Sequence, residues 1–241
     1  MGVPAPLSIL AGVNIFQWAL SVFLVSHVVV AVPAMRRHLT TRWSERGFLL
    51  GYSVMSTGLF TWLIISAMQA PTTALWPAAL WAYWVPVILM PVALTLLGAS
   101  VLTPNPLSIA LVPGGLDPKR PGAVAVTRHP ILWGLGLWGA THVPPNGDTV
   151  MLTLFGGLAF FAFTGMLIVE RKKRRVLGEE GWRALAAGTS IIPFLAILSG
   201  RARFPTDLRT LAGGLLGAAA AVYLLAGGHL TLFHRDPLSL F

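Results

Sequence analysis

Two histidines of this sequence lie in apolar runs long enough to be part of membrane-spanning helices. His27 lies in the run FLVSHVVVAV, and His142 ends the run WGLGLWGATH. An imidazole in hydrocarbon is costly, so each is a candidate for function. His27 precedes Arg36 by nine residues and His142 follows Arg128 by fourteen, which at about 1.5 Å per residue places them roughly 13 Å and 21 Å from one membrane face. That small height difference lets the imidazoles meet across adjacent helices, and two facing imidazoles are the axial ligands of a bis-histidine haem. His27 and His142 are therefore candidate ligands for the iron of a haem b.

Each of these histidines also has a structural interpretation. A core histidine bonded to a backbone carbonyl or a serine explains His27 equally well. His142 begins the loop HVPPNGD, where a polar residue at the membrane edge is ordinary. In that loop, Asn146-Gly147-Asp148 predicts a tight turn, with Asp148 or Thr149 near the N-cap of the next helix.

Arg128, His129 and Glu170 form a second candidate site, at the expected membrane edge. The segment Arg128-His129-Pro130 places an arginine where a loop becomes a helix, and such a helix N-terminus suits a phosphate or carboxylate. Glu170 ends an apolar run at the same level and can pair with Arg128. Taken alone, this pattern favours a salt-bridged cluster at the membrane edge over a catalytic site.

The composition predicts that a helical membrane protein positions these residues. Of the 241 residues, 55% are hydrophobic and only 10% are charged, whereas globular domains carry roughly 25% charged residues. The mean hydropathy is +0.74. A spanning helix needs about 20 mostly apolar residues. Five segments qualify: 7–32, 48–68, 74–97, 150–169 and 211–232.

Two further apolar segments are shorter. Segment 130–142 is short for a span, and 191–198 contains Pro193, which favours a re-entrant or interfacial segment. Prolines within the third span predict kinks, and the Gly- and Ala-rich last span predicts close packing. We expect an all-α transmembrane bundle of about six spans, plus the re-entrant or interfacial segment, forming a single domain over residues 1–241. The first apolar run is too long and lacks the basic start of a cleavable signal peptide, so we expect none.

The basic residues predict the orientation of the bundle. Placing loops 33–47, 98–129 and 170–210 on one side collects 16 of the 17 basic residues there and leaves Arg235 on the other. The positive-inside rule makes the basic side cytoplasmic, so both termini face outward. This orientation requires 130–142 to cross and 184–200 not to. The net charge of +9 then reflects topology and attraction to the lipid bilayer rather than a nucleic-acid partner.

Several classes of site are excluded by the sequence. With zero cysteines, it has no disulfide, thiolate metal site or cysteine nucleophile. It also lacks the P-loop, HExxH and GxSxG patterns. All eight Asp and Glu residues lie at or beyond the ends of the spans, which argues against an ion-coupled transporter.

Several motifs follow one another in an order typical of one family. HVVVAVPAMRRHL ends the first helix, and RWSERGF leads into the second, which carries Ser53 and Gly58. RHPILWGLGLWGATHVPPNGD looks like an RHP–LWA–AH–NGD block, and ERKKRRVLGEEGWRALAAGTSIIPF and a terminal DPLSLF follow. By these motifs the sequence resembles the NnrU family over most of its length.

This resemblance implies a function in the membrane. The family includes bacterial proteins linked to denitrification and the plant zeta-carotene isomerase, a haem-dependent membrane enzyme that isomerises a carotenoid double bond. By resemblance, His27 and His142 occupy the positions of haem axial ligands, the substrate is a lipid-soluble small molecule, and the protein resides in a bacterial inner membrane. The sequence departs from the family at THVPPNGD, where two prolines replace apolar residues.

A more distant resemblance gives the second interpretation. RHP followed by an acidic residue near the end of the next helix is similar to isoprenylcysteine and phospholipid methyltransferases. There these elements hold S-adenosylmethionine, which makes Arg128, His129 and Glu170 the candidate catalytic residues. The second acid of that pattern is missing, because Val169 precedes Glu170.

Three classes of function therefore stay open. The first is a haem-binding redox or isomerase-type membrane protein, which needs both intramembrane histidines. The second is an S-adenosylmethionine-dependent methyltransferase, which needs a cytoplasmic pocket. The third is a non-enzymatic membrane partner of a respiratory or nitrogen-oxide complex, which needs neither.

Overall fold

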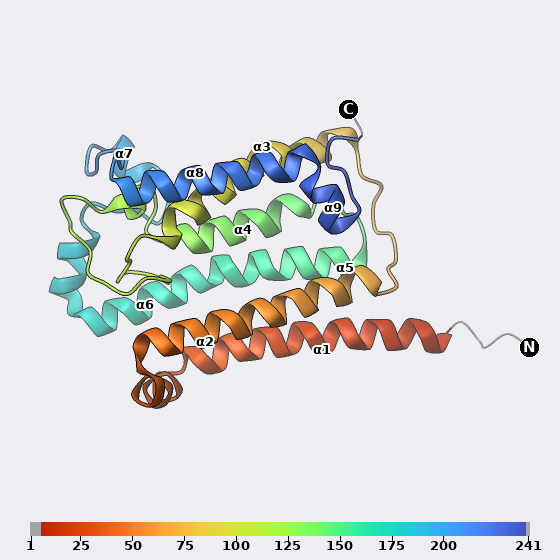
Figure 1. The fold of residues 1–241 in the computed structure, drawn as a ribbon, viewed down its shortest axis with the longest axis horizontal. Coiled ribbons are helices and arrows are strands. Elements are labelled where there is room, and N and C mark those ends of the chain that lie inside the picture. The colour runs from red at the N-terminus through yellow and green to blue at the C-terminus, as the bar shows by residue number, and fades with distance from the viewer. Residues whose placement is uncertain (1–5, 240–241) are drawn as a thin grey trace, which may run out of the picture. The chain divides into compact units, whose positions relative to one another are not determined.

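The computed structural model describes residues 6–239, with side chains from residue 15 onward. Within that range the chain is helical without strands, and one isolated bridge pairs Ala74 with Asp148. The expected all-α fold is confirmed (Figure 1). The prediction about a signal peptide falls partly on residues 1–5, which lie outside the described range.

Apolar helices of membrane length dominate the described chain. Four stretches are long and apolar enough to cross a membrane: Pro33–Gln69, Leu80–Val101, Thr149–Ala186 and Leu208–Phe233. The elements in chain order are α1 (Pro6–Ala31), α2 (Pro33–Gln69), α3 (Leu80–Val101), η1 (Gly122–Ala125), α4 (Pro130–His142), α5 (Thr149–Met151), the π-helix η2 (Leu152–Gly156), α6 (Gly157–Ala186), α7 (Leu195–Leu198), α8 (Leu208–Tyr223), the π-helix η3 (Leu224–Gly228) and α9 (His229–Phe233). The other two segments that the sequence predicts to span the membrane form α1 and the 13-residue α4, which are not among these four.

Contacts divide the chain into two compact units. The N-terminal unit holds residues 1–76 and 148–154, and the C-terminal unit holds residues 77–147 and 155–241. His27 belongs to the first unit, whereas His142, Arg128, His129 and Glu170 belong to the second.

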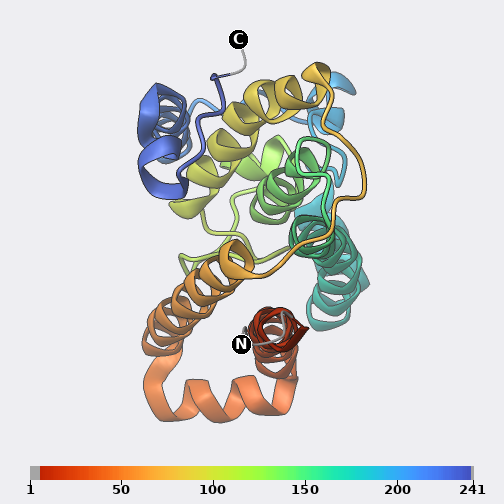
Figure 2. The same cartoon turned by 90° about the vertical axis from the view of Figure 1, so that its right-hand side faces the viewer.

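In the N-terminal unit, the predicted loop 33–47 is largely helical. Pro33 occupies the first turn of α2, where its missing N–H costs nothing. The helix then breaks at Ser44, whose φ of 64° and ψ of 165° turn the chain sharply. Figure 2 shows the resulting short helix crossing from α1 to the longer part of α2. The sequence pattern failed here because arginines and threonines are tolerated on an exposed helix as well as in a loop.

In the C-terminal unit, α3, α4, α6 and α8 lie side by side and alternate in direction (Figure 1). Glycines allow the closest approach. A Cβ on Gly98 of α3 would overlap the backbone of Gly213 of α8, and a Cβ on Gly213 would overlap the backbone of Gly98. A Cβ on Gly139 of α4 would lie 2.6 Å from the carbonyl oxygen of Phe155. These contacts agree with the close packing predicted for the Gly- and Ala-rich span.

Two boundaries differ from the sequence prediction. The third span begins at Leu80 rather than near residue 74, because Pro71 and Pro77 hold the preceding segment outside helical geometry. Its helix continues through Pro86 and Pro91. The helix through 150–169 does not end at Glu170 but reaches Ala186, with a break at Gly178 (φ 71°). The segment 191–198 forms a turn and the four-residue α7.

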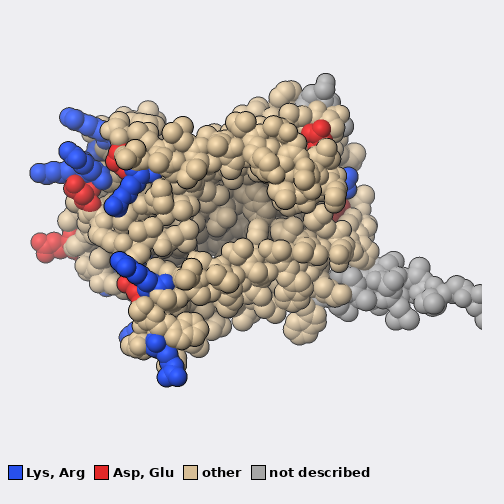
Figure 3. Space-filling view, in the orientation of Figure 1, with Lys and Arg blue, Asp and Glu red and all other residues tan. Residues whose placement is uncertain are grey.

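Charge is concentrated at one end of each unit. In the C-terminal unit, Lys and Arg gather where α6 and α7 lie, and in the N-terminal unit they gather in the first part of α2 (Figure 3). These are the ends formed by the predicted cytoplasmic loops.

Candidate functional site

Arg128, His129 and Glu170 come together in the structure. Arg128 and His129 precede α4, and Glu170 lies on α6. Arg128 Nη1 donates a hydrogen bond of 2.5 Å to Glu170 Oε1, and His129 Nε2 lies 3.2 Å from Oε2. Each oxygen of the carboxylate therefore has its own partner, and the pairing of Arg128 with Glu170 predicted from the sequence is present.

Side chains that the sequence analysis missed complete this cluster. Arg128 Nε donates to Thr189 Oγ1 at 2.9 Å, and its guanidinium lies 5.0 Å from the centre of the Trp182 ring. His129 Nδ1 lies 2.7 Å from Ser108 Oγ. No spacing in the sequence indicates Thr189, Trp182 or Ser108 as partners of this cluster.

The backbone around Arg128 is held as firmly as its side chain. Its N–H donates to the Ser190 carbonyl at 2.6 Å, and its own carbonyl accepts from Asn105 Nδ2 at 2.9 Å. One turn further, the Trp133 indole donates to the Ile191 carbonyl at 2.8 Å. The segment before α7 is thereby fixed against the start of α4.

Burial sets the protonation of this cluster. Arg128 is 9% exposed and His129 is fully buried. Burial lowers the pKa of His129 below its ordinary value, and the hydrogen bond to Glu170 opposes this only in part. Burial also lowers the pKa of Arg128, while Glu170 raises it. A neutral His129 that donates from Nε2 to the carboxylate must accept from the Ser108 hydroxyl at Nδ1, because a carboxylate can only accept.

This closed arrangement favours a structural role. Arg128, His129 and Glu170 use their polar atoms on one another and on neighbouring hydroxyls. A buried pair with full hydrogen bonding is what a low-dielectric position requires. The catalytic assignment of these three residues stays a prediction.

His27 lies in the N-terminal unit, on α1 against α2. Its Nδ1 is 2.7 Å from the carbonyl of Phe23, one turn earlier, and its Nε2 is 3.2 Å from Ser56 Oγ. The imidazole lies 4.2 Å from the Phe23 ring and 5.5 Å from the Tyr52 ring. Ser56 is a partner that the sequence analysis did not identify, although it expected a carbonyl or a serine.

His142 ends α4 in the C-terminal unit and repeats this geometry. Its Nδ1 is 2.7 Å from the carbonyl of Trp138, again one turn earlier. The imidazole stacks on Phe155 at 4.8 Å with an interplanar angle of 27°. Phe155 lies in η2, and π-helical turns are frequent at functional sites. Asn146 Nδ2 donates to the His142 carbonyl at 2.8 Å.

The predicted turn after His142 is present. Asp148 is the N-cap of α5, where its Oδ1 accepts from the N–H groups of Val150 and Met151. Within the described residues, no group of three or more His, Cys, Asp or Glu side chains could hold a metal ion. A haem held by two histidines needs only two such side chains.

Comparison with known proteins gives a family. The model of the family described as "NnrU protein" matches residues 15–237, which include both units. The chain is similar to "15-cis-zeta-carotene isomerase, chloroplastic" of Arabidopsis thaliana, with 33% identity over 86 residues, and to that of Zea mays, with 31% identity over 86 residues. Each match covers 36% of this chain and only 23% of the relative. No solved structure matches. The family model covers nearly the whole chain, and the chain therefore belongs to the NnrU family.

Proposed function

We propose that this protein is a membrane isomerase-like protein that holds haem b between His27 and His142 and acts on a lipid-soluble, conjugated substrate. The observation that carries the proposal is the similarity to two plant zeta-carotene isomerases within a shared family. Because the similar segment covers 23% of those enzymes, their activity and substrate enter here only as part of the proposal. A bacterial inner membrane, as expected from the sequence, is a further part of it.

The local geometry of both histidines fits an axial ligand. A metal-bound histidine usually donates its other ring N–H to a carbonyl or carboxylate, which fixes the ring. In His27 and His142 the Nδ1 atom meets the carbonyl four residues earlier at 2.7 Å. Each can donate from Nδ1, which leaves Nε2 as the ligating nitrogen. In His27 the Ser56 hydroxyl, now 3.2 Å from Nε2, must turn away.

His27 and His142 belong to separate units. Their pairing in this proposal therefore rests on the distances from one membrane face that the sequence predicts for them, roughly 13 Å and 21 Å. The aromatic rings of Phe23 and Phe155 pack against His27 and His142 respectively. Such rings hold an imidazole in one orientation and exclude water from it. They also offer apolar contacts to a polyene.

Bound haem supplies an iron that can alternate between ferric and ferrous states. The chain contributes the ligating nitrogens, their orientation by backbone carbonyls, and an apolar surface. Isomerisation of a double bond adds and removes no atoms, so no further titratable group in the spans is required. Among the described residues no contact specifically favours methyl transfer, and the denitrification link of the family stays a prediction.

The test is the absorption spectrum of the purified protein after haem-sufficient expression, oxidised and then reduced with dithionite. His27→Gly and His142→Gly are compared with the parent and with His38→Gly, which changes an exposed histidine in the basic first part of α2. We expect a Soret band and sharp reduced bands in the parent and in His38→Gly. Both bands should be lost in the other two variants and restored by added imidazole, which replaces the deleted ligand.

Two outcomes would overturn the proposal. A colourless parent protein would remove haem from it, and the alternatives of methyltransferase or non-enzymatic partner would take its place. Titration with S-adenosylmethionine then separates those two. If the parent has a haem spectrum and neither His27→Gly nor His142→Gly changes it, the protein binds haem but His27 and His142 are not its ligands.

A further inference from the structure

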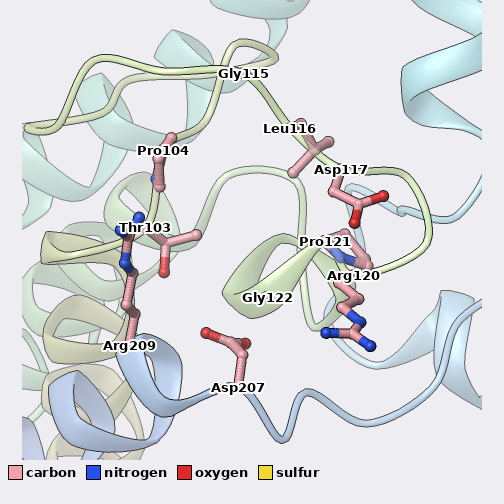
Figure 4. Close-up of a pocket in the computed structure, with 10 residues that line it drawn as sticks. All are labelled: Thr103, Pro104, Gly115, Leu116, Asp117, Arg120, Pro121, Gly122, Asp207 and Arg209. Carbon is pink, nitrogen blue, oxygen red and sulfur yellow. The ribbon is translucent and has the colours of Figure 1, made fainter.

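A polar pocket lies at the basic end of the C-terminal unit, and its lining residues are distinct from Arg128, His129 and Glu170. It is formed by the end of α3, the loop before η1 and the start of α8 (Figure 4). Its volume is about 180 Å³, below the roughly 300–1,000 Å³ typical of pockets for drug-sized ligands and cofactors. The pocket therefore has room for a small polar group rather than for a whole nucleotide cofactor.

Charges of both signs surround this pocket without neutralising one another. Its lining includes Asp117, Asp207, Arg120 and Arg209. In the described part of the chain these four side chains make no ion pair. Figure 4 shows the Asp207 carboxylate turned towards Gly122, with Arg120 on one side of it and Arg209 on the other. Acids and bases held apart around a cavity complement a ligand that itself carries both charges.

A buried hydroxyl without a partner lies directly behind the pocket. Thr210 is 6% exposed, and its Oγ1 has no hydrogen-bond partner within the described structure. It faces Gly122, because a Cβ on this glycine would lie 2.9 Å from Thr210 Oγ1 and 3.3 Å from Asp207 Oδ2. Gly122 has a φ of 59° and lines the pocket. An unsatisfied buried hydroxyl costs free energy, and a ligand at this position can supply the missing bond.

Asp207 has one oxygen available for such a ligand. Its Oδ1 caps α8 by accepting from the Thr210 N–H at 3.0 Å. Oδ2 lies towards Gly122 and the pocket. An ammonium group donates three hydrogen bonds, which suits Asp207 Oδ2 and the Thr210 hydroxyl. Arginine guanidinium groups are the usual partners of phosphate.

We propose that this pocket binds a phosphoethanolamine group, with its ammonium at Asp207 and Thr210 and its phosphate at Arg120 and Arg209. The pocket lies at the end of membrane-length helices, among the predicted cytoplasmic loops. A phospholipid in the adjacent leaflet can therefore present this group, as can a free small molecule. The proposal is independent of haem binding.

The experiment measures lipid binding to the full chain in detergent by native mass spectrometry, with phosphatidylethanolamine or phosphatidylglycerol as probe. Free phosphoethanolamine is added as a competitor. Asp207→Asn removes the charge but retains an equally good N-cap. The pair Arg120→Gln and Arg209→Gln removes the phosphate partners. Arg203→Gln, an exposed arginine at the same end, is the matched control.

We expect one phosphatidylethanolamine to bind in preference to phosphatidylglycerol. Its affinity should fall about tenfold or more in Asp207→Asn and in the double arginine variant, and should be unchanged in Arg203→Gln. Displacement by free phosphoethanolamine at the same concentration as the lipid would indicate a soluble source for the same group. Equal binding of the two lipids, with no effect of Asp207→Asn, would overturn the proposal in favour of general attraction to anionic lipid.

Thr210→Val gives a second readout. Removing a hydroxyl that has no partner should raise the midpoint of thermal unfolding of the unliganded protein. The same change should weaken binding of phosphatidylethanolamine. Unchanged lipid affinity in Thr210→Val would contradict the role assigned to this hydroxyl, whatever its effect on stability.

Discussion

Arg128 and Glu170 are joined by a 2.5 Å hydrogen bond between Nη1 and Oε1, although 42 residues separate them in the sequence. Their side chains are only 11% and 18% exposed. The pair connects the start of α4 to the middle of α6, and the contacts of Arg128 with Thr189 and Ser190 add the segment before α7. Three parts of the C-terminal unit therefore depend on one ion pair.

Glu170→Ala should destabilise the protein strongly. The change leaves a buried guanidinium with no countercharge, and breaking a buried pair in this way costs about 3–5 kcal/mol. The measurement is the free energy of unfolding in detergent, with Glu180→Ala as an exposed control on the same helix. The double change of Arg128→Met with Glu170→Met should restore part of the loss, since an apolar replacement leaves no unpaired charge. Equal stability of the parent and Glu170→Ala would contradict a structural role for the pair.

His129 should make stability depend on pH. Burial lowers its pKa below the ordinary value of 6.5, so the unfolded chain binds a proton at a pH where the folded chain does not. Stability is then complete above about pH 6.5 and falls as the pH decreases towards the folded pKa, by at most about 1.4 kcal/mol per pH unit for one proton. Arg128 and Glu170 face the imidazole and are unchanged in the comparison.

The measurement for His129 is the midpoint of thermal unfolding between pH 5 and pH 8, for the parent and for His129→Gln. The glutamine variant should be less stable overall but should lose the part of the pH dependence that comes from the imidazole. Identical pH profiles for the two proteins would show that His129 does not titrate on unfolding.

Much of this fold followed from hydropathy, and the failures have physical reasons. The 13-residue helix at 130–142 has the predicted bounds, because Pro130 and the turn at Asn146 fix both ends. The helix after Pro33 was missed, since its arginines and threonines carry no apolar period. The meeting of Arg128 with Glu170 could be predicted from their common level at the membrane edge. Ser108, Thr189 and Trp182 could not, because an isolated hydroxyl or aromatic residue in a loop carries no spacing that indicates its partner.

Ser56→Ala separates a structural His27 from a haem ligand. The Ser56 hydroxyl lies 3.2 Å from His27 Nε2, the nitrogen that must bind iron. If His27 is a ligand, removing the hydroxyl should leave the haem content per protein unchanged or increased. If His27 only joins α1 to α2 through this hydrogen bond, Ser56→Ala should lower the free energy of unfolding by about 1 kcal/mol. The protein should then contain no haem. Haem that is lost in Ser56→Ala while the fold is retained would contradict the first expectation.

Gly217→Ala should loosen the packing of α3 against α8. A Cβ at this position would overlap the backbone of Leu94 and lie 2.9 Å from the Cα of Thr95. Backbone atoms cannot rotate out of the way, so the helices must separate, at a cost of about 1–3 kcal/mol. Gly157→Ala is the matched control, because no atom of the described structure lies within 4 Å of its Cβ, and alanine there should be neutral or slightly stabilising. The midpoint of thermal unfolding in detergent should therefore fall for Gly217→Ala and not for Gly157→Ala. Equal midpoints would mean that the α3–α8 interface is not closely packed at Gly217, and that the glycines of α8 serve another purpose than close approach.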